Sequence, residues 1–347
     1  MISYFEDDLS TVLSNTKDCW GEFRGKTLFI TGGTGFFGIW LQMSFIYINR
    51  ELNLNAKLIV LTRNEESFLN KYAWLKEYKE VTFLKGDILD FTFIEEKVDY
   101  IIHAATEASV KLNLEEPLTM FETVVNGTKR VLEFARIKKV KSFLLTSSGA
   151  VYGKQPADIE NIKEDYQGAP NPSDAAAVYG EGKRMAEVLC AVYHKHFNLP
   201  VKIARCYAFI GPYLPLDSHF AAGNFISNVI KQEDIVIQGD GTPFRSYMYS
   251  ADLVTWLWKI LFNGEDNRPY NVGSDQSISI ADLAQLIATS ETEIKIMTPK
   301  SNQPVLRYVP NVDNAKRELG LKIYTNLESA VYKTIRFNQN TLNLSKK

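Results

Sequence analysis

Tyr179 and Lys183 stand four residues apart in a segment whose pattern predicts a long helix over about 177–196. Residues at this spacing share one face of a helix, so the Lys183 ammonium can approach the Tyr179 hydroxyl. A nearby cation favours the phenolate and lowers the pKa of a tyrosine, which suits a general acid and base near neutral pH. Taken alone, such a pair is also typical of an exposed helix surface.

A second pair of side chains could serve the same chemistry. Ser147 and Ser148 end an apolar segment at 141–146 that predicts a buried strand. The strand precedes the Tyr179 helix, so its end should deliver a hydroxyl to the same edge of a sheet. A hydroxyl there can stabilise charge that develops on a substrate oxygen.

Three glycines mark a possible cofactor site. Gly32, Gly35 and Gly38 follow a strand predicted at 27–30 and precede an apolar helix predicted at 39–48. In a dinucleotide site such glycines permit a tight turn, approach of the backbone to a pyrophosphate, and close packing of helix on strand. The helix N-terminus then offers free N–H groups to the phosphates. The alternative is an ordinary turn between a strand and a helix.

The next predicted strand, at 57–61, is followed by Arg63 where NAD-binding proteins carry an acid that bonds the ribose 2′-hydroxyl. An arginine at this position favours a 2′-phosphate. The sequence therefore predicts NADP as cofactor, with NAD possible. The alternative is an exposed arginine at a strand end.

Further strands are expected at 81–84, 99–104 and 201–207, with a return strand near 269–273. Strands that alternate with helices predict an α/β fold with a doubly wound, Rossmann-like parallel sheet. We expect a helical extension at 1–23 and a dinucleotide-binding domain at 24–209. Residues 210–347 should form mainly a smaller substrate-binding lobe over the carboxyl ends of the strands.

Composition excludes several classes of protein. The 347 residues are 45% hydrophobic and 23% charged with a net charge of −2, which gives no global field for nucleic acid or an anionic membrane. No apolar run approaches the roughly 18 residues of a spanning helix. The acidic N-terminus is unlike a signal peptide, and three scattered cysteines fit reduced thiols in the cytoplasm. The spacing of the four histidines argues against a metal site.

The glycine turn, the serine strand end and Tyr179-x-x-x-Lys183, in this order, resemble the extended short-chain dehydrogenase/reductase family of nucleotide-sugar epimerases, dehydratases and reductases. The resemblance covers about residues 25–330. It implies that Tyr179 is the catalytic acid and base and that Lys183 binds the nicotinamide ribose. The family's catalytic serine or threonine lies three residues before Val151-Tyr152-Gly153, which makes it Ser148, with Ser147 as its neighbour at the substrate.

The resemblance also implies further cofactor contacts. Asp87 and Ile88 resemble the adenine contact, and His103-Ala104-Ala105 resembles the loop beside the cofactor phosphates. Phe36 and Phe37, between the second and third glycines, belong to the same expected cofactor site.

In the second lobe, three residues match the family's substrate contacts. Asn224 resembles an asparagine that binds the substrate diphosphate, while Arg245 and Arg307 resemble two arginines that clamp it. Arginine suits this role because its forked donors match phosphate oxygens. The alternative for each arginine is a surface salt bridge.

The residues after Ser148 bear on the type of reaction. Related 4,6-dehydratases typically carry an acid pair after the catalytic threonine, and decarboxylases typically keep the glutamate; here Gly149 and Ala150 occupy these places. Neither can transfer a proton. We therefore expect hydride transfer at sugar C4 by a 4-ketosugar reductase or a 4-epimerase. A dehydratase with unusual acids and a non-catalytic NADP-binding sensor or scaffold are the alternatives.

Related enzymes pair through two helices, which here correspond to about 117–137 and 177–197. Both carry apolar residues that could form a core or a subunit interface. These are Phe121, Val125, Val131, Leu132, Val188, Leu189 and Val192. We expect a homodimer.

Overall fold

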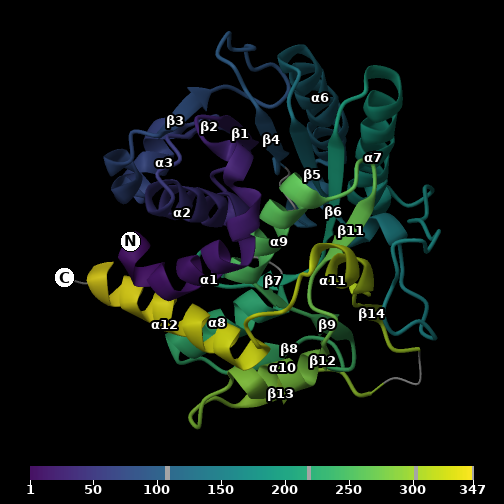
Figure 1. Ribbon diagram of the computed structural model, residues 1–347. Helices are drawn as coiled ribbons and strands as arrows, with labels where there is room; N and C mark the ends of the chain where they lie inside the picture. The colour runs from purple at the N-terminus through teal and green to yellow at the C-terminus, as the bar shows by residue number, and fades with distance from the viewer. Residues whose placement is uncertain (106–109, 217–219, 301–303, 346–347) are drawn as a thin grey trace.

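A parallel sheet of seven strands organises the computed structural model, which describes residues 1–105, 110–216, 220–300 and 304–345 (Figure 1). The strand order is β11-β6-β5-β4-β1-β2-β3, so the winding reverses between β1 and β4. The strands are β1 (Thr27–Thr31), β2 (Lys57–Thr62), β3 (Val81–Lys85), β4 (Tyr100–His103), β5 (Ser142–Ser148), β6 (Val201–Cys206) and β11 (Pro269–Val272). The expected doubly wound α/β fold is confirmed, and β11 stands where the return strand was expected.

Helices cover both faces of this sheet because alternate strand residues bury apolar side chains on opposite sides. Leu28 and Ile30 of β1 join one core cluster, whereas Phe29 joins the other. The first face carries α2 (Phe36–Glu51) and α9 (Ser250–Asn263), and the second carries α6 (Gly127–Lys138) and α7 (Val178–Phe197).

The helix expected at 117–137 is interrupted. It consists of α5 (Pro117–Phe121), a π-helical turn at Glu122–Asn126 and α6. Gly127 starts α6 where the chain passes close to Ile88, since a Cβ at Gly127 would lie 3.0 Å from Ile88 Cγ1. The shorter helix α3 (Glu65–Lys71) follows β2, and α4 (Val110–Glu115) precedes α5.

Short elements form a smaller lobe at the bottom of Figure 1. They are α8 (Ala221–Lys231), β8 (Ile235–Ile237), β9 (Phe244–Ser246), β12 (Ser277–Ser279), α10 (Ile280–Ile287), β13 (Ile294–Ile296) and β14 (Arg307–Tyr308). Strands β12, β9 and β14 make one small sheet, and β13 pairs with β8. The chain does not stay in this lobe, because α9 and β11 return to the large sheet before β12 begins.

The N-terminal helix α1 (Glu6–Thr16) is packed into the protein. Leu9 and Val12 are fully buried in the same core cluster as α2 and α9. Buried Asp8 accepts a hydrogen bond of 2.8 Å from the Tyr249 hydroxyl and pairs with Lys333 of α12 (Leu327–Ser345). These contacts bring the two ends of the chain together (Figure 1).

Within the described part of the chain, none of the helices has the length and apolar character needed to cross a membrane. Among the same residues, no cluster of three or more His, Cys, Asp or Glu side chains is placed to hold a metal ion.

Candidate active site

The glycine turn after β1 is pressed against the end of β4. Gly32 has a φ of +70°, and a Cβ there would lie 2.4 Å from the carbonyl carbon of Ala104. At Gly38 a Cβ would lie 2.1 Å from the Gly33 oxygen. Only glycine fits at these two positions, which allow the tight turn and the close packing of α2.

Gly35, at the N-terminus of α2, differs from its two neighbours in the motif. A Cβ there would meet only the Gly32 oxygen, at an ordinary distance of 3.5 Å. Packing within the protein therefore does not require a glycine at position 35. A dinucleotide phosphate drawn close to the backbone at the helix N-terminus would explain the glycine, so the turn fits the expected cofactor.

Phe36 and Phe37 begin α2 at this turn. The Phe37 ring packs edge-on against Phe209 with centroids 5.0 Å apart. Its side chain thus belongs to the core, and its backbone is the part placed at the expected cofactor site.

The buried His103 side chain links the end of β4, next to the Ala104–Ala105 loop, to β1 and α6. Its Nδ1 lies 2.7 Å from the Thr31 hydroxyl and its Nε2 lies 2.9 Å from the Thr128 hydroxyl. The Thr128 hydroxyl donates to the Val124 carbonyl, so it accepts from Nε2–H, and Nδ1 accepts from Thr31. Burial lowers the pKa of His103 to about 3, which keeps the ring neutral. Its imidazole is therefore a structural link, and the backbone of Ala104 and Ala105 forms the loop surface beside Gly32.

Lys183 lies at the carboxyl end of β5. Its Nζ donates a hydrogen bond of 2.8 Å to the Thr146 carbonyl, and the side chain is almost fully buried. Burial lowers the pKa of this lysine to about 8. The Thr146 hydroxyl in turn donates to the His103 carbonyl at 3.2 Å. Lysine, strand end and glycine loop are thus joined at one edge of the sheet.

The Tyr179 hydroxyl lies beside the Ser148 hydroxyl, as the motif order predicts. Burial raises the pKa of Tyr179 to about 12, and the polar contact with Ser148 lowers it only in part. The expectation that Lys183 depresses this pKa is therefore wrong for the protein alone. The physical reason is that loss of water at the phenol outweighs the favourable polar contacts, so Tyr179 is protonated at neutral pH.

Ser148 and Ser147 point to different surroundings because neighbours on a strand face opposite sides. The Ser148 oxygen accepts a hydrogen bond of 3.1 Å from the Ala150 amide. The Ser147 hydroxyl instead donates to Glu187 of α7, which pairs with Arg205 on β6. The structure brings Ser148 to Tyr179 and places Ser147 in a partly buried ionic network.

The start of α7 is anchored near Tyr179. The Tyr179 amide donates to Asn113 Oδ1 at 3.1 Å, and Asn113 Nδ2 donates to the Ala176 carbonyl at 2.9 Å. A Cβ at Gly180 would lie 2.9 Å from the Ala150 carbonyl oxygen, so glycine lets the helix approach the Ser148 strand end. The Asn113 contact is not visible in the motifs.

The remaining expected cofactor residues lie along neighbouring strand ends. Arg63 is exposed directly after β2, and within the described residues nothing forms a hydrogen bond or ion pair with it. Asp87 is half-buried after β3, where its carboxylate accepts from the Leu89 amide at 3.0 Å. Ile88 is buried against Gly127.

The substrate residues expected in the second lobe are spread over three elements. Asn224 is exposed in the first turn of α8. Arg245 is on β9 and Arg307 on β14, in a register that pairs Arg307 with Phe244 and Arg245 with Tyr308. Paired residues of parallel strands share a face, and the Arg307 guanidinium indeed stacks 4.6 Å from the Phe244 ring centre. The two arginines thus project from opposite faces, and the expectation that they form one clamp is not met in this arrangement.

Sequence reasoning missed Tyr308. Its hydroxyl lies beside Ser148 and within electrostatic range of Tyr179. No motif joins it to these residues, although it directly follows Arg307, which the sequence singled out.

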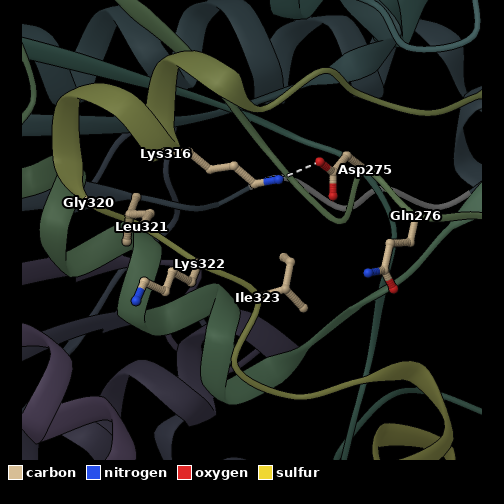
Figure 2. A pocket seen from close by; sticks show the side chains of 7 residues that line it. All are labelled: Asp275, Gln276, Lys316, Gly320, Leu321, Lys322 and Ile323. Carbon is tan, nitrogen blue, oxygen red and sulfur yellow. Dashed lines mark hydrogen bonds and ion pairs between the residues drawn. The ribbon is translucent and has the colours of Figure 1, made fainter.

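A separate hollow lies between the turn after β11 and the chain around α11 (Asp313–Leu319) (Figure 2). Lys316 points toward Asp275 across it, and the two form an ion pair. None of the residues expected to bind cofactor or substrate lines this hollow.

Comparison with known proteins decides the family. The model of the family described as "NAD dependent epimerase/dehydratase family" matches residues 28–273. The chain belongs to this family. The resemblance to extended short-chain dehydrogenases/reductases that act on nucleotide sugars is therefore confirmed, and the chain is an enzyme of an NAD-dependent family.

The names of individual relatives in this family describe different reactions. UDP-glucuronic acid decarboxylase 1 of Xenopus tropicalis is 30% identical over 316 residues, which are 90% of this chain and 72% of that protein. UDP-glucose 4-epimerase of Thermotoga maritima, solved with UDP-glucose, shares the fold with a TM-score of 0.76 and 23% identity over 91% of this chain and 99% of that one. The dTDP-glucose 4,6-dehydratase of Streptomyces venezuelae, solved with NAD, shares the fold with a TM-score of 0.77 and 22% identity. The match covers 92% of this chain and 98% of that one.

Proposed function

We propose that the protein modifies a nucleoside-diphosphate sugar by NAD(P)-dependent hydride transfer at sugar C4, as a 4-ketosugar reductase or a 4-epimerase. The observation that carries this proposal is the meeting of Ser148, Tyr179 and Lys183 at the end of β5, next to the glycine turn of β1. Binding alone would not need a proton donor and a hydroxyl at this edge. This weighs against a non-catalytic sensor or scaffold.

The chain's own groups divide the work at the 4-oxygen. A bound nicotinamide would supply or accept the hydride at C4. Tyr179 gives the 4-oxygen a proton during reduction and takes it back during oxidation. Ser148 donates a hydrogen bond to the same oxygen and stabilises the charge that develops there. We assign to Lys183, buried beside Thr146, the role of holding the nicotinamide ribose.

The protonated state of Tyr179 suits the reductive step. With a pKa raised to about 12 by burial, the phenol holds its proton at neutral pH. A ketosugar that receives a hydride needs a proton at the 4-oxygen, and a protonated phenol supplies it without prior activation.

Dehydratase and decarboxylase activities are the rival functions, and the second is suggested by the 30% identity to UDP-glucuronic acid decarboxylases. Gly149 and Ala150 stand where the related dehydratases typically carry an acid pair and the decarboxylases a glutamate. A dehydratase of this kind would need unusual acids from elsewhere. The missing acids therefore support a reaction confined to C4.

The proposed cofactor is NADP, with NAD as the alternative. Arg63 is exposed after β2 with its guanidinium available, which suits an adenosine 2′-phosphate. We expect NADP(H) to bind more tightly than NAD(H), and Arg63→Ala to weaken NADP(H) about tenfold with little effect on NAD(H), because one charge-assisted contact is lost. Titration calorimetry on both proteins measures this. Equal affinities for the two cofactors in the unmutated protein would contradict the role of Arg63.

Arg245 and Asn224 are the proposed diphosphate contacts. Arg245 shares a face with Tyr308, so its charge lies on the side of Ser148 and Tyr179. Arg307 could join Arg245 only if the β9–β14 sheet or its side chain rearranges. We further propose a cytoplasmic location, in keeping with three buried, unpaired cysteines.

We propose that the protein is a homodimer joined through α5 and α7. Large apolar side chains are exposed on both helices, and a subunit interface would bury them. They are Leu118, Phe121, Met185, Val188 and Val192. The expected interface positions Val131 and Leu132 are fully buried in the core, Val125 is buried and Leu189 is partly so.

Val188→Glu should convert the dimer to a monomer, because it buries a carboxylate in an apolar seam. Light scattering at micromolar concentration measures the mass. Val236→Glu on β8 is the matched control, since Val236 is also exposed but lies in the other lobe, and it should leave the dimer intact. A monomeric unmutated protein would exclude this assembly.

Incubation with a panel of nucleotide sugars and 4-keto-6-deoxy nucleotide sugars, with NADH and NADPH, tests the function. Mass spectrometry of the products separates the candidates. A reductase adds two hydrogens, an epimerase leaves the mass unchanged, a dehydratase removes water and a decarboxylase removes carbon dioxide. Loss of water or carbon dioxide would overturn the proposal, as would failure to turn over any member of the panel.

A further inference from the structure

Two tyrosines occupy the space beside Gly149, where the related dehydratases typically carry an acid. A Cβ at Gly149 would lie 2.7 Å from Tyr207 Cζ, 2.9 Å from Tyr207 Cε1 and 2.8 Å from the Tyr308 hydroxyl oxygen. A side chain at this position would therefore require the two tyrosine rings to move. The space that the acid would fill is occupied by two tyrosine rings, and Tyr308 comes from a distant part of the chain.

Tyr308 is held in this place by its neighbours. Its ring packs against the Tyr207 ring with centroids 4.6 Å apart and a tilt of 36°. On β14 it pairs with Arg245 of β9, one of the proposed diphosphate contacts. The phenol therefore reaches from the wall of the substrate-binding lobe to the end of β5, where it meets Ser148.

The hydrogen-bonding capacity of Ser148 limits what each neighbour can do. A serine hydroxyl has one donor hydrogen and two acceptor lone pairs. The Ala150 amide already donates to one lone pair, at 3.1 Å. Burial raises the pKa of Tyr308, so this phenol keeps its proton and can donate to the second lone pair. When Tyr308 donates in this way both lone pairs are used, and the Ser148 hydrogen points outward, toward Tyr179 and the substrate.

We propose that Tyr308 is a positioning residue that orients the Ser148 hydroxyl toward the sugar's 4-oxygen. This inference rests on the proposed function, because it assigns Ser148 the stabilisation of that oxygen. Tyr308 acts through Ser148, and its hydroxyl also closes the position that a proton-transferring acid would need.

Kinetics of a double-mutant cycle test the proposal. Tyr308→Phe should lower kcat about 10- to 100-fold, comparable with Ser148→Ala, because both impair one donor to the oxyanion. KM, cofactor affinity and Tm should change little, since the ring is kept. In the Ser148→Ala background Tyr308→Phe should have no further effect, because nothing remains to be oriented. Independent, multiplicative effects, or full activity of Tyr308→Phe in an active enzyme, would overturn the proposal.

Tyr207→Phe is the matched control. Its hydroxyl is buried, and no hydrogen-bond partner for it is found within the described part of the chain. Removing that hydroxyl keeps the ring that packs on Tyr308, so kcat should be unchanged. A loss equal to that of Tyr308→Phe would mean that the stacked rings matter and the Tyr308 hydroxyl does not.

A second measurement needs no substrate, so it separates a failure of this inference from a failure of the proposed function. Protein labelled with ¹³C at tyrosine Cζ is compared with its Ser148→Ala variant by NMR, and the Tyr308 and Tyr179 signals are assigned from the two Tyr→Phe variants. Loss of the serine should shift the Tyr308 signal as well as that of Tyr179, and leave Tyr207 unmoved. If the chemical shift of Tyr308 Cζ is the same in the Ser148→Ala variant, the contact between the Tyr308 and Ser148 hydroxyls is contradicted, whatever the substrate.

Discussion

Tyr179→Phe is expected to lower kcat by a factor on the order of 10²–10⁴, the usual range for the loss of a positioned proton-transfer group. The substitution removes one oxygen and keeps the ring, which packs at the start of α7. Folding, measured by Tm, and cofactor affinity, measured by calorimetry, should survive. The measurement requires saturating cofactor and a limiting chemical step.

Tyr193→Phe is a useful control for this experiment. Tyr193 lies on the same helix, and its hydroxyl contacts Glu133 at 3.2 Å, away from Ser148. Its loss should leave kcat unchanged. Full activity of Tyr179→Phe under the stated conditions would mean that the tyrosine–lysine motif has no catalytic role here, and the assignment of Ser148 and Lys183 would have to be withdrawn with it.

Replacement of Lys183 by methionine should impair both cofactor binding and turnover. The neutral side chain is close in length but lacks the ammonium that donates to the Thr146 carbonyl. Loss of a charge-assisted hydrogen bond to a ribose should weaken NAD(P)(H) by about 10- to 100-fold. Calorimetry and steady-state kinetics at several pH values measure the two effects.

Titration of Lys183 should make cofactor affinity and the free energy of unfolding depend on pH in opposite directions. Its pKa of about 8 in the fold lies below the ordinary value of 10.5, because burial disfavours the ammonium. Cofactor affinity of the unmutated protein should therefore fall as pH rises through about 8. The unfolded chain holds more protons than the fold between these two values, so the Lys183 contribution to the free energy of unfolding should rise with pH there.

Lys183→Met removes the Lys183 contribution to the pH dependence of both quantities. Each contribution is therefore measured as the difference between the unmutated protein and the variant. Other groups that contribute in this range then cancel, such as the buried tyrosines, which titrate near a pH of about 10 only in the unfolded chain. Affinity that stays constant from pH 7 to pH 10, within experimental error, would show that the lysine ammonium does not hold the cofactor.

Local patterns were sufficient for the large sheet and for part of the site. The apolar strand segments needed only short-range pattern, and they end within two residues of the observed β1, β2 and β5. Ser148 and Tyr179 could be brought together because β5 is followed, along the chain, by the helix that starts at the same sheet edge. Gly32 and Gly38 fit tight spaces that their motif predicts.

What the sequence could not supply depends on register, burial and distance along the chain. Arg245 and Arg307 are separated onto two faces by the pairing of β9 with β14, which no composition reveals. The pKa of Tyr179 is set by burial that only the folded site shows. Tyr308 reaches Ser148 from a two-residue strand in another lobe, far along the chain. Side-chain contacts between residues so far apart leave no periodic pattern in the sequence from which they could be predicted.

The most direct test of the proposed reaction is the fate of deuterium at C4. The reductive assay uses NAD(P)H deuterated at the transferred position, and the epimerase assay uses a nucleotide sugar deuterated at sugar C4. We predict that the label appears at sugar C4 of the reduced product, or stays at C4 of the epimerised product without exchange into water. Release of the label to solvent, or turnover that leaves C4 untouched, would contradict hydride transfer at C4 as the function of this protein.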